Sequence, residues 1–139
     1  MTRAADSRWG TVRDWMTREP ETVAVDCPIS TAMLRMQRRE IRHLLVVDGP
    51  RLVGVVSNRD LRRLLTGDTP GSVGDPVSRI MTEDLVTVSP EVPVAEAARL
   101  LLEQKIGALP VREGGLVVGI FTTSDALDAL LSVAERPAP

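Results

Sequence analysis

Two short segments of the sequence, 65 positions apart, each place a hydroxyl three residues before a carboxylate. They are Ser57 with Asp60 and Thr122 with Asp125. Each pair falls where an apolar run gives way to a helical pattern, so both side chains can face one cleft. A helix N-terminus offers free backbone N–H groups and partial positive charge, which suit phosphate, and an aspartate there can accept two hydrogen bonds from a ribose diol. The spacing therefore fits a site for ribose and phosphate at each junction.

The same spacing is also typical of a helix N-cap followed by an acidic residue in the first turn. On the local pattern alone, this purely structural interpretation is the commoner one. The two interpretations do not exclude each other, so both stay open at this point.

The composition excludes several classes of function. The chain has 139 residues with 17 Lys+Arg against 19 Asp+Glu, and a formal net charge of −2 gives no bulk attraction to nucleic acid. Cys27 and His43 are its whole supply of Cys and His, so no zinc site is expected. The single lysine, Lys105, lies outside any P-loop motif, and three aromatic residues are too few to stack bases. No nucleophile is paired with a base at a recognisable spacing, so we do not expect an enzyme.

The cysteine content and the hydropathy bear on location. A lone cysteine cannot form an internal disulfide, which fits a reduced compartment. No apolar run approaches the roughly 18 residues of a membrane span, and the first residues lack the apolar stretch of a signal peptide. We therefore expect a cytoplasmic protein that does not bind membranes.

The sequence contains an internal duplication. Shifting it by 65 positions superimposes Val12–Leu65 on Val77–Leu130 without a gap, and the matched positions include apolar, glycine and acidic residues. We therefore divide the chain into a first repeat (12–65), a polar Gly/Pro-rich linker (66–76) and a second repeat (77–131).

Each repeat predicts the same elements, in the order β-α-β-β-α. A short strand is followed by a helix with apolar residues at helical spacing, then by a hairpin and a closing helix. The expected first strands are Thr22–Val25 and Val86–Val88, the hairpin strands are Leu44–Val47 with Leu52–Val56 and Leu109–Val111 with Leu116–Phe121, and the closing helices are Arg59–Leu65 and Ser124–Leu131. A short helical segment should precede each repeat, capped by Thr11 with Asp14 and by Asp75 with Pro76. The fold class is α/β (α+β), with tandem repeats whose sheets pack together because about 54 residues are marginal alone.

At this point the sequence resembles a known family. The duplicated unit, the hairpin start I-x-x-L-[LP]-V at Ile41–Val46 and Ile106–Val111, and the ending G-x-x-[ST]-x-x-D at Gly54–Asp60 and Gly119–Asp125 are similar to a pair of CBS domains, a Bateman module. Each motif is loose, but their ordered appearance twice at a fixed offset is specific. The resemblance covers most of the chain, from Val12 to Leu130.

The resemblance implies a regulatory ligand-binding module with pseudo-two-fold symmetry, not an enzyme. Such modules hold AMP, ADP or ATP, and sometimes S-adenosylmethionine or NAD, in two clefts between the repeats, with no required cofactor. Asp60 and Asp125 would then bind ribose hydroxyls, and Ser57 and Thr122 would contact ribose or phosphate. The other ligand-binding residues that it implies are Arg59 and Ser124 beside the hydroxyls, Thr17, Thr22, Val23, Thr82, Val86 and Thr87 around adenine, and Arg42, His43, Gly107 and Ala108 along the phosphate path.

The two repeats differ in charge, which the family pattern does not supply. The first has ten arginines against seven acids, and the second has four basic residues against eight acids. Because arginine forks suit phosphate oxygens, we hypothesise that phosphates lie near Arg42, His43 and Arg59 and that only one cleft binds a polyphosphate tightly. The arginines at three-to-four spacing also fit the solvated face of a helix, or a contact with the acidic repeat of a partner chain.

Three functions remain open from the sequence. The leading hypothesis is an adenine-nucleotide sensor, for instance of energy state, that signals through a rearranged homodimer or an unidentified regulated protein. The alternative is a ligand-free scaffold for dimerisation or protein interaction, which the intact Asp60 and Asp125 disfavour. A nucleic-acid-binding regulator is disfavoured by the net charge and by the few aromatic residues.

Overall fold

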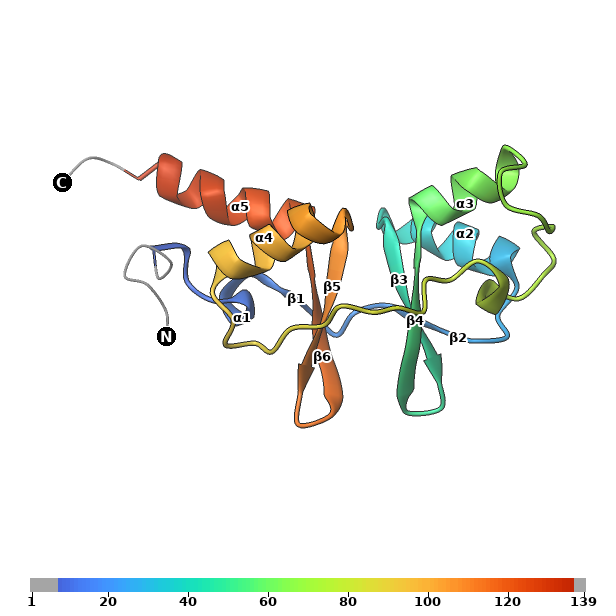
Figure 1. Cartoon of the computed structure of the whole chain (residues 1–139), viewed down its shortest axis with the longest axis horizontal. Coiled ribbons are helices and arrows are strands. Elements are labelled where there is room, and N and C mark those ends of the chain that lie inside the picture. Colours follow the sequence, from blue (N-terminus) through green and yellow to red (C-terminus); the bar gives the residue numbers. More distant parts are fainter. Residues whose placement is uncertain (1–7, 137–139) are drawn as a thin grey trace. The chain divides into compact units, whose positions relative to one another are not determined.

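The apolar runs form two three-stranded sheets in the computed structural model, which describes residues 8–136 (Figure 1). The chain divides into two compact units. The inner unit is Pro20–Leu85, and the outer unit combines the chain up to Glu19 with the chain from Val86 onward. No helix among the described residues has the length and apolar character to cross a membrane.

The inner unit contains one hairpin and two helices. Its elements are β2 (Thr22–Ala24), α2 (Ile29–Arg39), β3 (His43–Asp48), β4 (Arg51–Ser57), α3 (Asn58–Leu65) and a 3-10 helix, η2 (Val77–Arg79). The sheet order is β2-β3-β4, with β2 parallel to β3 and β3 antiparallel to β4. Met36 of α2, Leu61 of α3 and Leu44 of β3 lie in one apolar core, so both helices cover the same sheet.

The outer unit repeats this architecture with elements from both ends of the chain. They are α1 (Val12–Trp15), β1 (Thr17–Arg18), α4 (Val94–Gln104), β5 (Ala108–Glu113), β6 (Leu116–Thr122) and α5 (Thr123–Ala134). The sheet order is β1-β6-β5, with antiparallel pairs throughout. Figure 1 shows α4 and α5 beside one end of the β5–β6 hairpin, while its turn extends away from them. The expected β-α-β-β-α order is thus confirmed in full for the first repeat and from its first long helix onward for the second, with the closing helices beginning one residue earlier than predicted.

The first residues of each repeat pack on the body of the other repeat. The Val12 N–H donates to the Val92 carbonyl at 2.8 Å, and the Val77 N–H donates to the Cys27 carbonyl at 2.8 Å. These two bonds are equivalent, because 65 positions separate the two donors and also the two acceptors. The contact surfaces are therefore duplicated along with the sequence, and each compact unit contains parts of both repeats.

Because each unit contains parts of both repeats, the difference in charge between the repeats does not carry over to the units. The inner unit has nine basic and nine acidic residues, and the outer unit has eight basic and ten acidic residues. The surplus of arginine in the first repeat is therefore not a surplus of its unit. The charge difference is found on the helices instead: α2 and α3 carry six arginines and one acid, whereas α4 and α5 carry four acids and one arginine.

The strand expected at Val86–Val88 is absent, and this prediction was wrong. Only an isolated parallel bridge joins Val88 to Val111. In the inner unit the Leu45 N–H donates to the Glu21 carbonyl at 3.2 Å and extends the pairing of β2 with β3. The matched residue of β5 is Pro110, which has no N–H to donate. The pairing therefore shrinks to one bridge.

The cap predicted at Asp75 was also wrong. The 3-10 helix η2 begins at Val77 with Pro76 as its N-cap, and the Asp75 carboxylate instead accepts from the Ser72 N–H at 2.9 Å. The backbone of the linker has another role. The carbonyls of Asp75 and Val73 accept from the Ile29 and Ser30 N–H groups at 2.9 and 2.8 Å, which satisfies the first turn of α2 after Pro28, a residue without a capping side chain.

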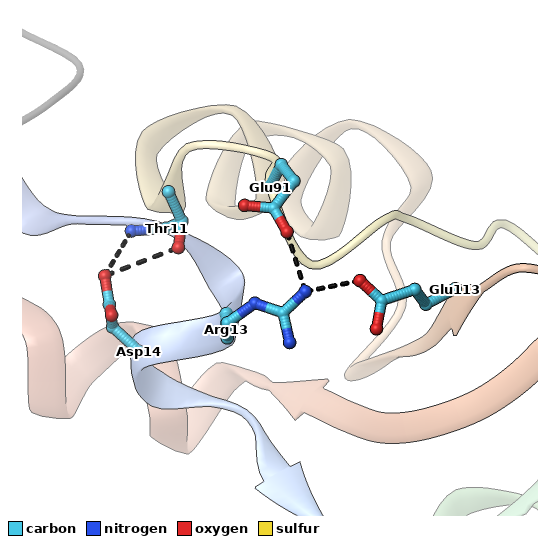
Figure 2. Close-up of polar contacts among 5 residues, drawn as sticks. All are labelled: Thr11, Arg13, Asp14, Glu91 and Glu113. Atoms are coloured by element: carbon cyan, nitrogen blue, oxygen red, sulfur yellow. Dashed lines mark hydrogen bonds and ion pairs between the residues drawn. The ribbon is translucent and has the colours of Figure 1, made fainter.

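The predicted cap of the first helical segment is confirmed, and an ion-pair cluster lies beside it (Figure 2). The Thr11 N–H donates to Asp14 Oδ2 at 2.9 Å. Arg13 Nη2 lies 2.7 Å from Glu91 Oε1 and also contacts Glu113. The hydrogen bonds that Arg13 donates, to Glu91 first and then to Glu113, raise the pKa of Arg13. The cluster joins α1 to the loop before α4 and to β5, all within the outer unit.

Candidate functional site

Both hydroxyl–carboxylate pairs form complete capping boxes at the start of the closing helices. At α3 the Ser57 N–H and hydroxyl donate to Asp60 Oδ2 at 2.8 and 3.0 Å, and the Asp60 N–H donates to Ser57 Oγ at 3.2 Å. At α5 the same three bonds join Thr122 and Asp125 at 2.8, 3.1 and 3.4 Å. The N-cap interpretation is therefore confirmed at both junctions.

The capping boxes leave one carboxylate oxygen of each aspartate available. Oδ2 receives both donors, while Oδ1 of Asp60 and of Asp125 accepts no hydrogen bond within residues 8–136. Both residues are half-buried, and the boxes hold their side chains in one orientation. An oriented carboxylate oxygen of this kind can accept a hydroxyl from a ligand.

Each junction also brings the start of its hairpin to the same place. The Asn58 N–H donates to the Arg42 carbonyl at 2.9 Å, and His43 lies opposite Ser57 in the β3–β4 register. In the outer unit the Thr123 N–H donates to the Gly107 carbonyl at 3.1 Å, and Ala108 lies opposite Thr122. The sites predicted from the sequence therefore converge within each unit as Arg42, His43, Ser57, Arg59 and Asp60, and as Gly107, Ala108, Thr122, Ser124 and Asp125.

The remaining predicted residues divide into two groups. Thr17 and Thr82 lie next to the motif strands, because Thr17 pairs with Ile120 of β6 and Thr82 bridges Val55 of β4. Thr22 and Val23 lie on β2, which β3 separates from β4. In the outer unit, Val86 and Thr87 precede the bridge of Val88 to β5 and likewise lie away from β6.

Two of the predicted residues have side chains that are out of reach of a ligand. Val23 is 4% exposed within the inner core, and Ala108 is 7% exposed. Alternation along β2 explains the burial of Val23, since Thr22 and Ala24 on either side are exposed, whereas Ala108 begins a run of four buried residues on β5.

The two junctions differ in charge. Arg42 and Arg59 are exposed, and their guanidinium groups form no ion pair among the described residues. The matched residues of the outer unit, Gly107 and Ser124, are uncharged. The inner junction is therefore the more favourable of the two for a phosphate.

The electrostatics of the inner junction centre on His43. Burial of its ring lowers the pKa of His43 below its usual value; Asp60 opposes this effect by raising it, and Arg42 lowers it further. At neutral pH the imidazole is therefore uncharged. In the outer unit, burial raises the pKa of Asp125, which the hydrogen bonds from the Thr122 N–H and hydroxyl oppose.

We expect His43 to make the protein less stable as the pH falls from about 7 to about 5. The unfolded chain binds a proton to His43 in this range more readily than the folded chain does, so acidification favours unfolding. Urea unfolding of wild type and of His43→Gln at both pH values measures the effect. The variant should lose less stability than wild type across the range, and equal losses in the two chains would contradict the assignment.

The described residues offer little to a metal ion. No group of three or more His, Cys, Asp or Glu side chains within residues 8–136 could hold one. The site is therefore described by its hydrogen-bonding groups and by its arginines.

Comparison with known proteins decides the family. The CBS domain family matches the chain twice, over residues 12–67 and 77–132. The chain belongs to the CBS domain family. A CBS domain-containing protein of Dictyostelium discoideum is 33% identical over 139 residues, covering 92% of this chain and 96% of that protein.

Two solved CBS structures carry adenosine compounds. The crystal structure of CBSX2 in complex with AMP has a TM-score of 0.77 and 32% identity, and covers 90% of this chain and 98% of that one. The CBS domain pair of protein MJ0100, in complex with 5′-methylthioadenosine and S-adenosyl-L-methionine, has a TM-score of 0.78 and 26% identity, with the same coverage. This CBS pair therefore has the fold of ligand-binding regulatory modules.

Two residues beside the CBS motifs, Met16 and Met81, were not predicted from the sequence. An ideal Cβ on Gly54 would lie 2.6 Å from Met81 Sδ, and one on Gly119 would lie 2.8 Å from Met16 Sδ. Met16 and Met81 precede Thr17 and Thr82, and they occupy the space that the motif glycines leave open. Their match in the repeat alignment was a signal that could have identified them.

Proposed function

We propose that this CBS pair is a regulatory module that binds an adenosine-containing ligand, namely AMP, ADP or ATP, at the two junctions, and that it is not an enzyme. The observation that carries the proposal is the free Oδ1 of Asp60 and of Asp125, each held in place by a complete capping box. The adenosine compounds in CBSX2 and MJ0100 support this ligand class.

We further propose that the inner junction takes the phosphates. Arg42 and Arg59 flank it, while Gly107 and Ser124 occupy the matched positions of the outer junction. ATP should therefore gain most from the inner junction, S-adenosylmethionine, which has no phosphate, should gain least, and NAD, with two phosphates, should lie between them.

The partners that we propose are the ligand itself, a second copy of the chain, and a regulated protein. Ligand binding regulates only if it binds two arrangements of the module with different affinity, so that it shifts the population between them. A homodimer or a bound target is then the element that transmits the change.

The experiment is calorimetric titration with AMP, ADP, ATP, S-adenosylmethionine and NADH. Asp60→Asn and Asp125→Asn are suitable variants, because asparagine can still accept the capping hydrogen bonds while it loses the charge. We expect each substitution to weaken binding at its own junction at least about tenfold, and Asp60→Asn to affect ATP more than Asp125→Asn does.

Asp48→Asn is the matched control, since Asp48 is an exposed acid at the turn end of the β3–β4 hairpin, away from both junctions. Two equal sites for ATP would contradict the proposed preference of the inner junction. No heat with any of the five compounds, from folded protein at about millimolar ligand, would overturn the ligand proposal and favour a ligand-free interaction scaffold.

A further inference from the structure

The first residues of repeat 1 are held on the outer unit by an ion-pair cluster. Arg13 contacts both Glu91, in the loop before α4, and Glu113, at the end of β5 (Figure 2). The Arg13 side chain is only 35% exposed, so the two pairs are partly shielded from solvent. The cluster therefore fastens the segment Val12–Thr17, which we call the outer lead-in, to the body of repeat 2.

The inner unit keeps the acids of this cluster but not its arginine. The residues that match Glu91, Glu113 and Arg13 at the offset of 65 positions are Asp26, Asp48 and Ser78. Neither Asp26 nor Asp48 forms an ion pair within residues 8–136. Because serine carries no charge, no ion pair fastens the matched segment Val77–Thr82, which we call the inner lead-in.

The backbone contacts of the inner lead-in are also weaker. The Ser78 N–H donates to the Val25 carbonyl at 3.3 Å, whereas the matched bond from the Arg13 N–H to the Pro90 carbonyl is 2.9 Å long. The helix α1 has a capping box, whereas η2 has no side-chain cap. The two-residue strand β1 is reduced to a single bridge at Thr82. The inner lead-in should therefore detach at a lower free-energy cost than the outer lead-in.

Detachment is a minor state, and it is confined to a short segment. Val77 is fully buried and Ile80 is 8% exposed in the inner core, so release exposes apolar surface. The linker upstream stays bonded, because the Asp75 carbonyl accepts from the Ile29 N–H at 2.9 Å. Downstream, the chain leaves the inner unit after Leu85. Release therefore lengthens the unattached connection that leads into the outer unit.

The inner lead-in also reaches the inner junction. The Thr82 N–H donates to the Val55 carbonyl at 2.8 Å, and the Val55 N–H donates to the Thr82 carbonyl at 3.0 Å. Val55 lies on β4 two residues before Ser57, which caps α3 at the proposed ligand site. Detachment would therefore remove Thr82 from beside this site.

We infer that the inner lead-in is a releasable segment whose attachment is coupled to ligand binding at the inner junction, while Arg13 keeps the outer lead-in attached. The coupling rests on the proposed function, whereas the difference between the two lead-ins does not. A ligand that binds only the attached state suppresses detachment by the factor 1 + [L]/Kd. Ligand occupancy would then set how firmly the chain is held where it leaves the inner unit.

Amide hydrogen exchange of the ligand-free protein, followed by NMR, tests the release. The amides of Val12 and Val77 are a matched pair, because each donates a 2.8 Å bond to the body of the other repeat. The protection factor at Val77 should be at least about tenfold lower than at Val12. Equal protection at the two amides, or greater protection at Val77, would overturn the inference.

Transfer of the ion-pair cluster tests its cause. Ser78→Arg combined with Asp26→Glu and Asp48→Glu rebuilds the outer cluster in the inner unit and should raise the protection factor at Val77 about fivefold. The two Asp→Glu substitutions alone are the matched control and should leave it unchanged. Arg13→Ser should lower the protection factor at Val12 by about the same factor of five. No change at either amide in these variants, shown to be folded by circular dichroism, would overturn the role of the arginine.

Exchange in the presence of ATP tests the coupling. The measurement uses the Asp125→Asn variant, in which ATP binding at the outer junction is expected to be weaker. At one hundred times its dissociation constant, ATP should slow exchange at Val77 and Thr82 about a hundredfold and change exchange at Val12 less than about threefold. Equal slowing at Val12, or no slowing at Val77 despite calorimetric binding, would overturn the coupling.

Failure of the proposed function is distinguishable from failure of this inference. If calorimetry detects no binding of ATP at the inner junction, the coupling falls together with the proposed function. The ligand-free difference between Val12 and Val77 is measured without any ligand, so it would stand in that case. Equal protection of these two amides would instead overturn the releasable lead-in and leave the calorimetric result intact.

Discussion

Replacing Phe121 with alanine is expected to lower the free energy of unfolding by about 4 kcal/mol. Phe121 lies on β6 and is the largest fully buried side chain of the outer core. Alanine would remove the whole ring, and the rigid strands on either side cannot move together enough to fill the cavity. Urea unfolding monitored by circular dichroism measures the difference.

Two further variants test whether the cavity is the cause. Phe121→Leu keeps most of the volume and should cost about 1 to 2 kcal/mol, whereas Leu116→Ala, on the same strand but 66% exposed, should stay within about 0.5 kcal/mol. The matched inner residue is Val56, which is also fully buried, so the two cores are filled differently. A cost below about 1 kcal/mol for Phe121→Ala would contradict the close packing of this core.

The elements of each repeat could be predicted from the sequence because local patterns determine them. Ile29, Ala32 and Met36 have the helical spacing that buries one face of α2, and Gly49 and Gly114 stand at the hairpin turns with φ of +60°. The capping boxes followed from a spacing of three residues alone. These features depend on contacts that are close in the sequence.

The packing of the first residues of each repeat on the body of the other repeat was not predictable in the same way. An offset comparison shows that Val12 matches Val77, but it does not show which body either residue contacts. If these residues packed on their own repeat instead of on the other one, the sequence would show the same duplicated pattern, because both contact surfaces are duplicated. The sequence-based domain division therefore remains a description of the repeats, while the compact units combine parts of both.

Single residues account for the other differences. Pro110 removes one N–H from β5 and reduces an expected strand to a bridge at Val88. Alternation along β2 sends Val23 into the core and leaves Thr22 exposed, so the motif alone could not tell which of the residues predicted to lie around adenine have an accessible side chain. In both cases the structure depends on pairing between strands that are far apart in the sequence, which a local sequence pattern does not reveal.

Long-range contacts also determine the need for the glycine that opens each CBS motif, and its substitution should destabilise the protein strongly. Gly119→Val should lower the free energy of unfolding by about 3 kcal/mol. An ideal Cβ on Gly119 would lie 2.8 Å from the Thr17 carbonyl oxygen, and β1 pairs with β6 at this point. A backbone carbonyl held in a sheet cannot move aside, so the added methyl groups would displace β1 from the outer unit.

Gly54 offers a matched comparison, because its close neighbours are side-chain atoms of Met81, with Sδ at 2.6 Å. A methionine side chain can rotate away, so Gly54→Ala should cost about 1 kcal/mol and Gly119→Ala about 2 kcal/mol. Urea unfolding gives both values, and hydrogen exchange along Thr17–Arg18 reports the release of β1. Equal costs at Gly54 and Gly119 would show that the Thr17 carbonyl does not decide the effect. A larger loss of stability at Gly119 than at Gly54 would show that the motif serves two purposes. Its carboxylate is available to a ligand, and its glycine leaves room for the first residues of the other repeat.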